Sequence, residues 1–282
     1  MKKIVKKSML VIVTIVILVL VYLFSAIVPG LVAKRGFNLD GHQGCLLVAH
    51  RGGAGLGIEN TLDCIARGME TRADMIEVDI HLTKDGHIVV CHDQSVDRMT
   101  DGKGLIRDMT LAQLRQLNVI DANDNPTGYK IPTLEEVLAM VDGHKKLLIE
   151  IKRTGGIYAG IEDKLVEMLY DHDALDWCVV QSFNDSVLDN IHAIAPDIRL
   201  EKLLICKLPL LPVIFDGTFQ WYDLKRYSYV KSFNFYYLAA SSDIIDELHE
   251  NGREVKVWTL DGPDSTPDMP YDGVISDRPD LF

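Results

Sequence analysis

Residues 75–93 read MIEVDIHLTKDGHIVVCHD, and this stretch decides the fold class. Met75–Ile80 and Ile88–Val90 are apolar and rich in β-branched residues, as strands are. The turn sequence Lys84-Asp85-Gly86 separates them. The stretch therefore predicts two consecutive strands, and the segments on either side indicate which kind of sheet these strands join.

Strand-like and helix-like segments alternate along the rest of the chain. Further strand-like runs are Cys45–Ala49, Leu147–Ile151, Cys178–Val180, Arg199–Leu204, Tyr229–Phe233 and Val255–Trp258. Helix-like segments are one that begins at Thr61 with Asn60 as its cap, Thr110–Leu117, Thr133–Val141, Ile161–Tyr170, Asp185–Ala195 and Ser241–Asn251. This alternation predicts an α/β fold with a parallel sheet, and roughly eight strands suit a TIM (β/α)8 barrel. In such a barrel the chemistry belongs at the C-terminal ends of the strands.

The N-terminal segment differs from the rest of the chain. Ser8–Ala33 carries no charged residue and is long enough to cross a bilayer as one helix. A cleaved signal peptide is the alternative, but the apolar run exceeds the usual 7–15 residues. We therefore expect 1–35 to be a lysine-rich cytoplasmic tip and transmembrane anchor, 36–44 a linker and 45–282 the catalytic barrel. Four lysines precede the apolar run, which predicts a cytoplasmic N-terminus and an extracytoplasmic barrel.

Charge and cysteine content exclude several classes of function. Residues 1–35 hold six basic and no acidic residues, so the remainder has 23 basic and 41 acidic residues, a net charge of −18. Such a surface repels nucleic acid and anionic lipid headgroups. The five cysteines form no CxxC pair, so we expect no zinc site and interpret them as small buried residues.

Acidic residues inside the strand-like runs suggest a metal site. Glu77 and Asp79 are two residues apart, so their side chains point to the same face of a strand. Carboxylates inside a barrel are costly to bury unless a cation neutralises them, and Glu150 adds a third. Three oxygen donors without cysteine suit Ca²⁺ or Mg²⁺. The alternative is an outward, solvated pair with Val78 inside, because a period of two does not fix the face.

Two histidines and two basic residues follow the same runs. His50 and His92 each come after a strand-like run, and imidazole, with a pKa of about 6.5, suits proton transfer near neutrality. One histidine could deprotonate a nucleophile while the other protonates a leaving group. Arg51 and Lys152 supply positive charge that would bind a phosphate. A lone histidine is more often structural, so the prediction depends on the pair and its basic neighbours.

Nine motifs occur in order along the chain. They are His50-Arg51-Gly52, Glu59-Asn60-Thr61, Glu77-Val78-Asp79, Leu82-Thr83-Lys84-Asp85-Gly86, His92-Asp93, Ile131-Pro132-Thr133-Leu134-Glu135-Glu136, Glu150-Ile151-Lys152, Gln181-Ser182-Phe183 and Gly273-Val274-Ile275-Ser276-Asp277. In this order they resemble the glycerophosphodiester phosphodiesterase family. The resemblance extends from His50 to the C-terminus.

The resemblance implies a TIM barrel that hydrolyses glycerophosphodiesters to an alcohol and sn-glycerol 3-phosphate, using one divalent ion, Ca²⁺ or Mg²⁺. The site residues that it implies are Glu77, Asp79 and Glu150 for the metal, His50 and His92 for acid–base catalysis, and Arg51, Lys152, Glu59 and Trp258 for phosphate and substrate, Glu59 in a supporting role. For Trp258, packing in the core is the alternative.

The sequence departs from the family pattern in two places. Asp261 stands where the family usually has asparagine, and Glu201–Asp223 matches none of the motifs. Within that segment, Leu203–Phe215 is apolar, and it predicts either a buried barrel strand with its loop or, over Leu208–Phe215, an apolar lip beside the pocket. Substrate choice therefore stays open between glycerophosphodiesters and, in a lysophospholipase D-like reaction, lysolipids. A catalytically silent phosphodiester-binding membrane protein is the alternative from another class.

Overall fold

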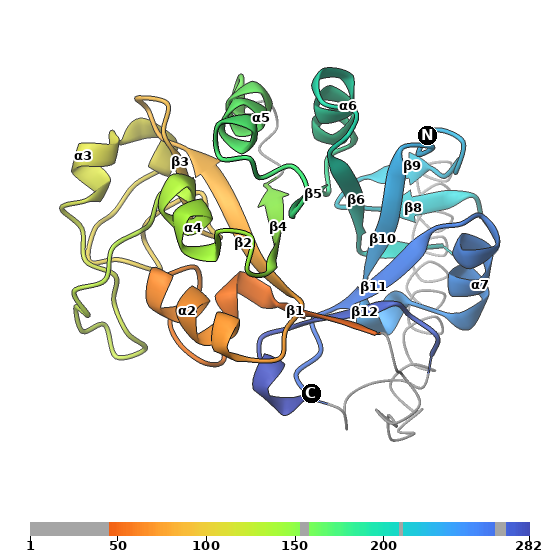
Figure 1. Ribbon diagram of the computed structural model, residues 1–282, viewed down its shortest axis with the longest axis horizontal. Coiled ribbons are helices and arrows are strands. Elements are labelled where there is room, and N and C mark those ends of the chain that lie inside the picture. Colours follow the sequence, from red (N-terminus) through yellow and green to blue (C-terminus); the bar gives the residue numbers. More distant parts are fainter. Residues whose placement is uncertain (1–44, 153–157, 209–210, 263–268) are drawn as a thin grey trace, which may run out of the picture.

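The computed structural model describes residues 45–152, 158–208, 211–262 and 269–282. Among them, a nine-stranded sheet closes on itself through the pairing of its first two strands, and all but one of its strands are parallel. The parallel strands are β1 (Leu46–Ala49), β2 (Met75–Leu82), β4 (Lys146–Ile151), β5 (Cys178–Ser182), β6 (Arg199–Leu204), β10 (Val230–Tyr236), β11 (Glu254–Trp258) and β12 (Gly273–Ser276). The expected TIM barrel is confirmed (Figure 1).

Helices cover the outside of the barrel (Figure 1). They are α2 (Leu62–Glu70), α4 (Leu134–Val141), α5 (Ile161–Asp171), α6 (Asp185–Ile194) and α7 (Ser242–Glu250). Thr133 caps α4 in a capping box with Glu136, as its position before an apolar run predicts. The cap of α2 is Thr61 and not Asn60, because the Asn60 side chain bonds Asp79 inside the barrel instead. One predicted helix is much shorter, since α3 covers only Leu111–Leu114.

The barrel strands are buried on both faces, which explains their apolar sequences. In β4, Leu147 and Ile149 pack in the large core between barrel and helices, whereas Leu148 points inside. The inner cluster consists of Val48, Met75, Leu148, Val179 and Ile275. Two positions after Met75, Leu148 and Val179, the strands β2, β4 and β5 carry Glu77, Glu150 and Gln181. An apolar layer thus lies under a polar layer nearer the C-terminal ends of the strands.

The second strand-like run of the opening stretch is not a barrel strand. It forms β3 (Ile88–Val90), which pairs antiparallel with the end of β2, so the two make a hairpin. The residues that follow β3 contain α3 and pack around a small core of their own, which includes Val96, Ile106 and Leu114. This insertion occupies one side of the barrel mouth, beside α4 (Figure 1).

A small antiparallel sheet stands where the helix between β6 and β10 would be expected. Its strands are β7 (Cys206–Lys207), β8 (Val213–Phe215) and β9 (Phe219–Trp221). Figure 1 shows it on the outside of the barrel beside β6 and β10. The apolar segment Leu203–Phe215 is therefore divided: Leu203 and Leu204 complete a buried barrel strand, and β8 belongs to the added sheet.

The predicted anchor and linker, residues 1–44, lie outside the described residues. Among the helices that are described, none has the length and apolar character that a bilayer crossing requires. All five cysteines fall in the described part of the chain and are free thiols, three of them buried.

Candidate active site

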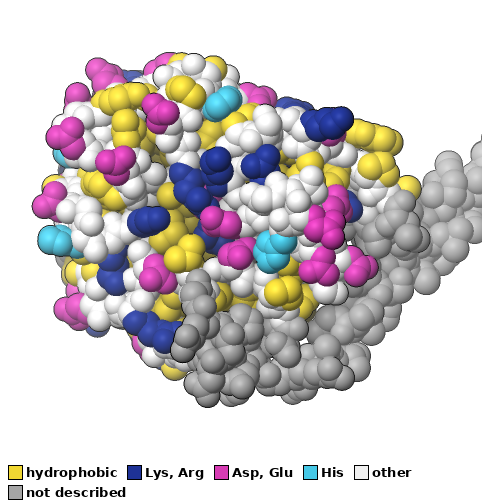
Figure 2. Space-filling model, turned by 45° about the vertical axis from the view of Figure 1, so that its right-hand side comes forward, with side chains coloured by type: hydrophobic (Ala, Val, Ile, Leu, Met, Phe, Trp, Pro, Cys, Tyr) yellow, Lys and Arg dark blue, Asp and Glu magenta, His cyan; other side chains and the backbone are white. Residues whose placement is uncertain are grey.

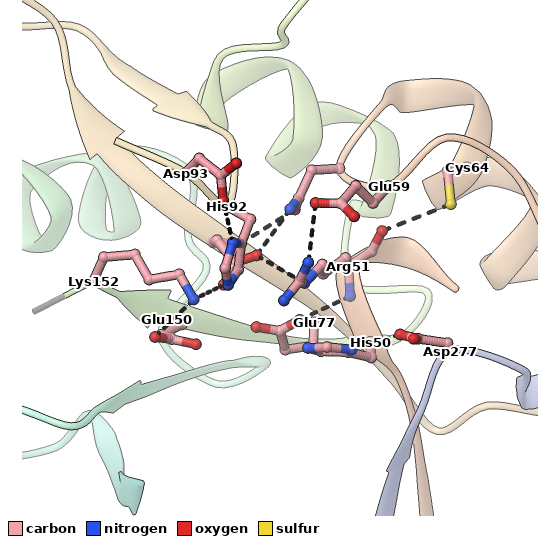
Figure 3. Close-up of polar contacts among 12 residues, drawn as sticks. His50, Arg51, Glu59, Cys64, Glu77, His92, Asp93, Glu150, Lys152 and Asp277 are labelled. Carbon is pink, nitrogen blue, oxygen red and sulfur yellow. Dashed lines mark hydrogen bonds and ion pairs between the residues drawn. The ribbon is translucent and has the colours of Figure 1, made fainter. Parts of the chain in front are cut away.

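Three carboxylates meet inside the barrel near its mouth. β2 and β4 pair in a register that sets Asp79 opposite Glu150, and Glu77 lies two residues earlier on the same face of β2. Each offers one oxygen, and these oxygens lie within 4.8 Å of one another. Figure 3 shows Glu77 and Glu150 of this cluster, with Lys152 next to Glu150. All three side chains are buried. Val78 points instead into the core between barrel and helices, so the outward arrangement considered from the sequence is wrong.

The electrostatics of this cluster call for a cation. Burial, followed by the negative charge of Asp79, raises the pKa of Glu77 to about 8. Burial also raises the pKa of Glu150 above its ordinary value. Burial acts the same way on Asp79, but the positive charges of Lys152, His92 and Arg51 together outweigh it and hold the pKa of Asp79 below its usual range. The buried donor set consists of carboxylate oxygens alone, which fits a hard divalent ion such as Ca²⁺ or Mg²⁺.

Basic side chains line the same part of the site. Lys152 Nζ lies 2.7 Å from Asp79 Oδ1 and 3.0 Å from Glu150 Oε1, and these charges raise its pKa although burial lowers it. Arg51 Nη1 donates to Glu59 Oε1 at 3.0 Å. The buried Arg51 Nε makes no hydrogen bond within the described part of the chain, and Asp79 Oδ2 is 3.7 Å away. A guanidinium donor that makes no hydrogen bond suits a phosphate oxygen.

His50 is placed by the first strand and by the last. It follows β1 in the 3-10 turn η2 (His50–Gly52), and Asp277 follows β12, which pairs with β1. Their contact, His50 Nδ1 to Asp277 Oδ1, is 2.6 Å. The turn requires glycine at Gly52, where φ is +85° and a Cβ would come within 2.9 Å of the Ile65 side chain.

His92 reaches the site by a different route from the one that the sequence suggests. It does not lie at the C-terminal end of a barrel strand, because β3 runs antiparallel to β2. The hairpin returns the chain to the barrel mouth, where Cys91 N donates to Asp79 O at 2.9 Å. His92 Nδ1 then lies 2.7 Å from Asp93 Oδ1. Both histidines therefore have a carboxylate at Nδ1, and among the described residues neither Nε2 is hydrogen-bonded.

The two imidazoles differ in their pKa values. Burial lowers the pKa of His50, but the hydrogen bond to Asp277 and nearby carboxylate charge outweigh it, so the pKa is raised. For His92, burial and then the positive charge of Lys152 lower the pKa. A pair of titratable groups whose environments push their pKa values apart is what acid–base catalysis requires.

Some residues of the site have no assigned role in the sequence motifs. Arg98 bridges Asp93 and Glu59, with contacts of 2.6 Å and 2.7 Å. Glu59 is thus held by Arg98 as well as by Arg51, and it supports the site through these two arginines. Nothing in the sequence near Arg98 indicates this bridge. Asp93 could have been found from the sequence, because it directly follows His92.

Amide side chains orient the carboxylates. Asn60 Nδ2 donates to Asp79 Oδ2 at 2.8 Å. Gln181 Nε2 donates to Glu77 Oε1 at 3.4 Å, and its own oxygen accepts from Asn234 Nδ2 at 2.9 Å. These bonds cross the barrel interior, so they join residues that are far apart in the sequence.

Trp258 lies at the end of β11, half-buried at the barrel mouth. Its Nε1 donates to Asn234 O at 3.0 Å, and its ring packs against Phe183 and Tyr236 at centroid distances of 5.8 Å and 5.5 Å. The side chain also packs against the inner apolar cluster. It therefore has the packing role considered from the sequence, and it also forms part of an aromatic wall at the mouth.

Asp261, the departure from the family pattern, acts on the loop after β12. Its Oδ1 accepts from the backbone N of Asp277 at 2.8 Å and from Ser276 Oγ at 3.2 Å. It thereby fixes the segment that carries the carboxylate partner of His50. Two hydrogen-bond donors thus satisfy the carboxylate of Asp261.

The chain is similar to known proteins over most of its length. The model of the glycerophosphoryl diester phosphodiesterase family matches residues 50–281. A glycerophosphodiester phosphodiesterase of Caldanaerobacter subterraneus subsp. tengcongensis is 34% identical over 84% of this chain and 96% of its own, and one of Bacillus subtilis is 30% identical over 91% of each. An Oleispira antarctica phosphodiesterase, solved in complex with the product sn-glycerol-3-phosphate, has a TM-score of 0.70 at 24% identity, covering 83% of this chain and 93% of its own.

Fold, site and relatives together define a TIM-barrel hydrolase of phosphoric diesters. Within that class, the chain belongs to the glycerophosphoryl diester phosphodiesterase family. The family expected from the ordered motifs is therefore confirmed.

Proposed function

We propose that this protein hydrolyses glycerophosphodiesters to an alcohol and sn-glycerol 3-phosphate. The observation that carries the proposal is the buried carboxylate cluster with Arg51 and Lys152 beside it and a carboxylate-bound histidine on each flank. The presence of both histidines and all three carboxylates at one site argues against the catalytically silent alternative.

Glu77, Asp79 and Glu150 would hold one divalent cation. When bound, such an ion polarises the phosphate and offsets charge that develops on its oxygens. Lys152 and the unused Nε donor of Arg51 orient and neutralise the phosphate from the protein side. The apolar layer beneath the cluster limits water on that side of the site. The ion's identity is an open choice between Ca²⁺ and Mg²⁺.

The histidines divide the proton transfers. With Nδ1 bound to Asp93 and a lowered pKa, His92 is neutral near pH 7, and its Nε2 accepts the proton of the attacking hydroxyl. His50, with its raised pKa, donates a proton from Nε2 to the leaving alcohol oxygen. Asp277 and Asp93 hold the rings in the tautomers that these roles need. The attacking hydroxyl is that of water or of the glycerol moiety itself; the second gives a cyclic phosphate first.

A product-resolved turnover assay tests the proposal. Full-length protein in detergent is assayed with glycerophosphocholine and glycerophosphoethanolamine, in excess chelator and with Ca²⁺ or Mg²⁺ restored. Release of sn-glycerol 3-phosphate only with the metal supports it. Binding without turnover under every condition would establish the silent alternative. Lysophosphatidylcholine in the same screen measures the lysophospholipase D-like reaction.

We also propose that residues 1–35 anchor the enzyme in the membrane, with the N-terminus in the cytoplasm and the barrel outside. The support is the uncharged run Ser8–Ala33, the four lysines before it and the acidic remainder of the chain.

A further inference from the structure

The added sheet β7–β9 has an apolar outer face. The register pairs Cys206 with Phe215, Phe215 with Phe219, and Val213 with Trp221, and residues opposite each other in antiparallel strands share a face. All five of these side chains are apolar. Phe219 and Trp221 are 67% and 71% exposed, and the rings of Phe215 and Phe219 pack at 4.8 Å.

The opposite face of the same sheet carries polar side chains. Lys207 Nζ lies 2.9 Å from Glu247 of α7, and Gln220 Nε2 donates to Asp216 at 2.9 Å. Between them, Ile214 is fully buried in the main core. An antiparallel sheet on a water-facing surface normally turns its apolar face inward and its polar face out. Here the polar groups are satisfied on the inner face, and the outer face presents only apolar side chains.

The short stretch of chain between the proposed anchor and the barrel indicates what covers this face. The described chain begins at Cys45, and nine residues, 36–44, separate it from the apolar segment that we propose as the anchor. Fully extended, nine residues reach about 30 Å, so the anchor would keep the barrel against the bilayer. Tryptophan and phenylalanine are the residues that proteins place at the membrane interface.

We propose that the outer face of β7–β9 inserts into the membrane interface. Apolar contact, and not charge, mediates the insertion, because the remainder of the chain is strongly acidic and acidic side chains are spread over the surface (Figure 2). The face begins directly after β6, at the C-terminal end of the barrel, so its insertion brings the active-site mouth close to the lipid headgroups. This inference rests on the anchor proposed above.

Quenching of tryptophan fluorescence tests the contact directly. The full-length protein is reconstituted into nanodiscs of phosphatidylcholine, with or without bromine near the headgroup end of the acyl chains. The chain has three tryptophans, and Trp221→Phe removes one while keeping the face apolar. We expect bromine to quench part of the wild-type emission, and we expect the quenched part to disappear in Trp221→Phe.

The other outcomes each overturn the inference in a recognisable way. Protein that stays in nanodiscs but shows no Trp221 quenching refutes the inserted face and leaves the anchor standing. A Trp221 that is shielded from bromine, with a sedimentation coefficient that falls after Phe219→Asp plus Trp221→Asp, shows a second copy on the face. Protein that does not reconstitute into nanodiscs refutes the anchor and, with it, this inference.

Turnover of a membrane-bound and of a soluble substrate tests the inserted face independently. Phe219→Asp plus Trp221→Asp should lower turnover of lysophosphatidylcholine in bilayers several-fold and leave turnover of soluble glycerophosphocholine unchanged. The matched control is Tyr170→Asp plus Ile194→Asp, which changes two exposed apolar residues on α5 and α6. Equal loss in the control pair, or no loss in the test pair, would overturn the inference.

Discussion

Each candidate catalytic histidine is bound at Nδ1 and leaves Nε2 for the substrate. We therefore expect His50→Ala and His92→Ala each to lower kcat about 10²–10⁴-fold, the usual contribution of general acid–base catalysis. Both variants should keep the wild-type circular dichroism spectrum. His87→Ala is the control, since His87 is largely exposed and lies 4.0 Å from the carboxylate of Asp85, outside the site. Near wild-type turnover in either test variant would remove that residue from the mechanism.

The carboxylate partner of His50 should set the pH dependence of the reaction. Asp277→Asn keeps an oxygen that can accept from His50 Nδ1 but removes the negative charge that strengthens this bond and favours the imidazolium, so the pKa of His50 should fall. A general acid works only while protonated, and the alkaline limb of the pH–rate profile should then move to lower pH. The profile of kcat between about pH 5 and pH 10 measures this shift. An unchanged limb in a folded variant of lower activity would mean that Asp277 acts on structure alone.

The sequence predicts those site residues that lie close together in the chain, or whose spacing along a strand sets them on one face. Glu77 and Asp79 are two apart in a strand, which fixes their common face, and burial of Met75 on that face turns both inward. Arg98 and Asn234 could not be found this way. Glu59, which Arg98 bonds, is 39 residues away, and Gln181, which Asn234 bonds, is 53 residues away; the insertion and the barrel closure bring these pairs together.

At the scale of elements, Lys202 joins three parts of the fold. It lies on β6, and its Nζ contacts Asp185 of α6 at 2.8 Å and Asp216, between β8 and β9, at 2.7 Å. All three side chains are buried. This ion cluster attaches the added sheet to the barrel in the place where a helix would otherwise pack.

We expect Lys202→Met to lower the free energy of unfolding by about 3–5 kcal/mol, because it removes the buried cation that Asp216 and Asp185 share and leaves Asp185 with the more exposed Arg226, 3.3 Å away. Urea denaturation followed by circular dichroism measures the change. Lys202→Met combined with Asp216→Asn should recover part of it, since one of the uncompensated charges is then removed. A single variant as stable as the wild type would show that the cluster is solvated and does not attach the sheet.

The elements themselves were predictable to different degrees. Buried parallel strands and capped helices, such as β6 and α4, have long apolar or periodic signals, and their predicted ranges agree with the structure to within a residue. The strands of the added sheet have two or three residues each, too few for a period of two to show. The sequence did not predict β12 as a strand, because its four residues, Gly273–Ser276, are also too few to show a period of two.

At the scale of the whole molecule, the barrel should be more stable with metal than without it. The three carboxylates repel one another in a buried site, and at a free-ion concentration of 100 times Kd, binding contributes about 2.7 kcal/mol. Chelator should therefore lower Tm, and Ca²⁺ or Mg²⁺ should restore it. Affinity for the ion should rise as the pH approaches 8, because Glu77, with a pKa of about 8, must lose its proton to bind.

Differential scanning fluorimetry and calorimetric titration at several pH values measure both effects. Glu77→Gln, Asp79→Asn and Glu150→Gln should each weaken the metal-dependent rise in Tm. Arg67→Gln is a surface control, since its partner Asp63 lies on the outer side of α2. Full activity and an unchanged Tm in excess chelator would contradict the metal site.

The arrangement that we propose for the chain across the membrane rests on its charge distribution. Six basic residues and no acidic ones occupy 1–35, and the remainder carries a net charge of −18. Because lysines flanking a membrane span stay in the cytoplasm, the barrel should face the outside. Protease added to intact cells should then degrade the barrel, and a cytoplasmic control protein should survive until lysis. The mass of the purified chain separates a retained anchor from a cleaved signal peptide, which would remove the apolar run. Protection of the barrel in intact cells, with digestion only after lysis, would reverse the proposed orientation.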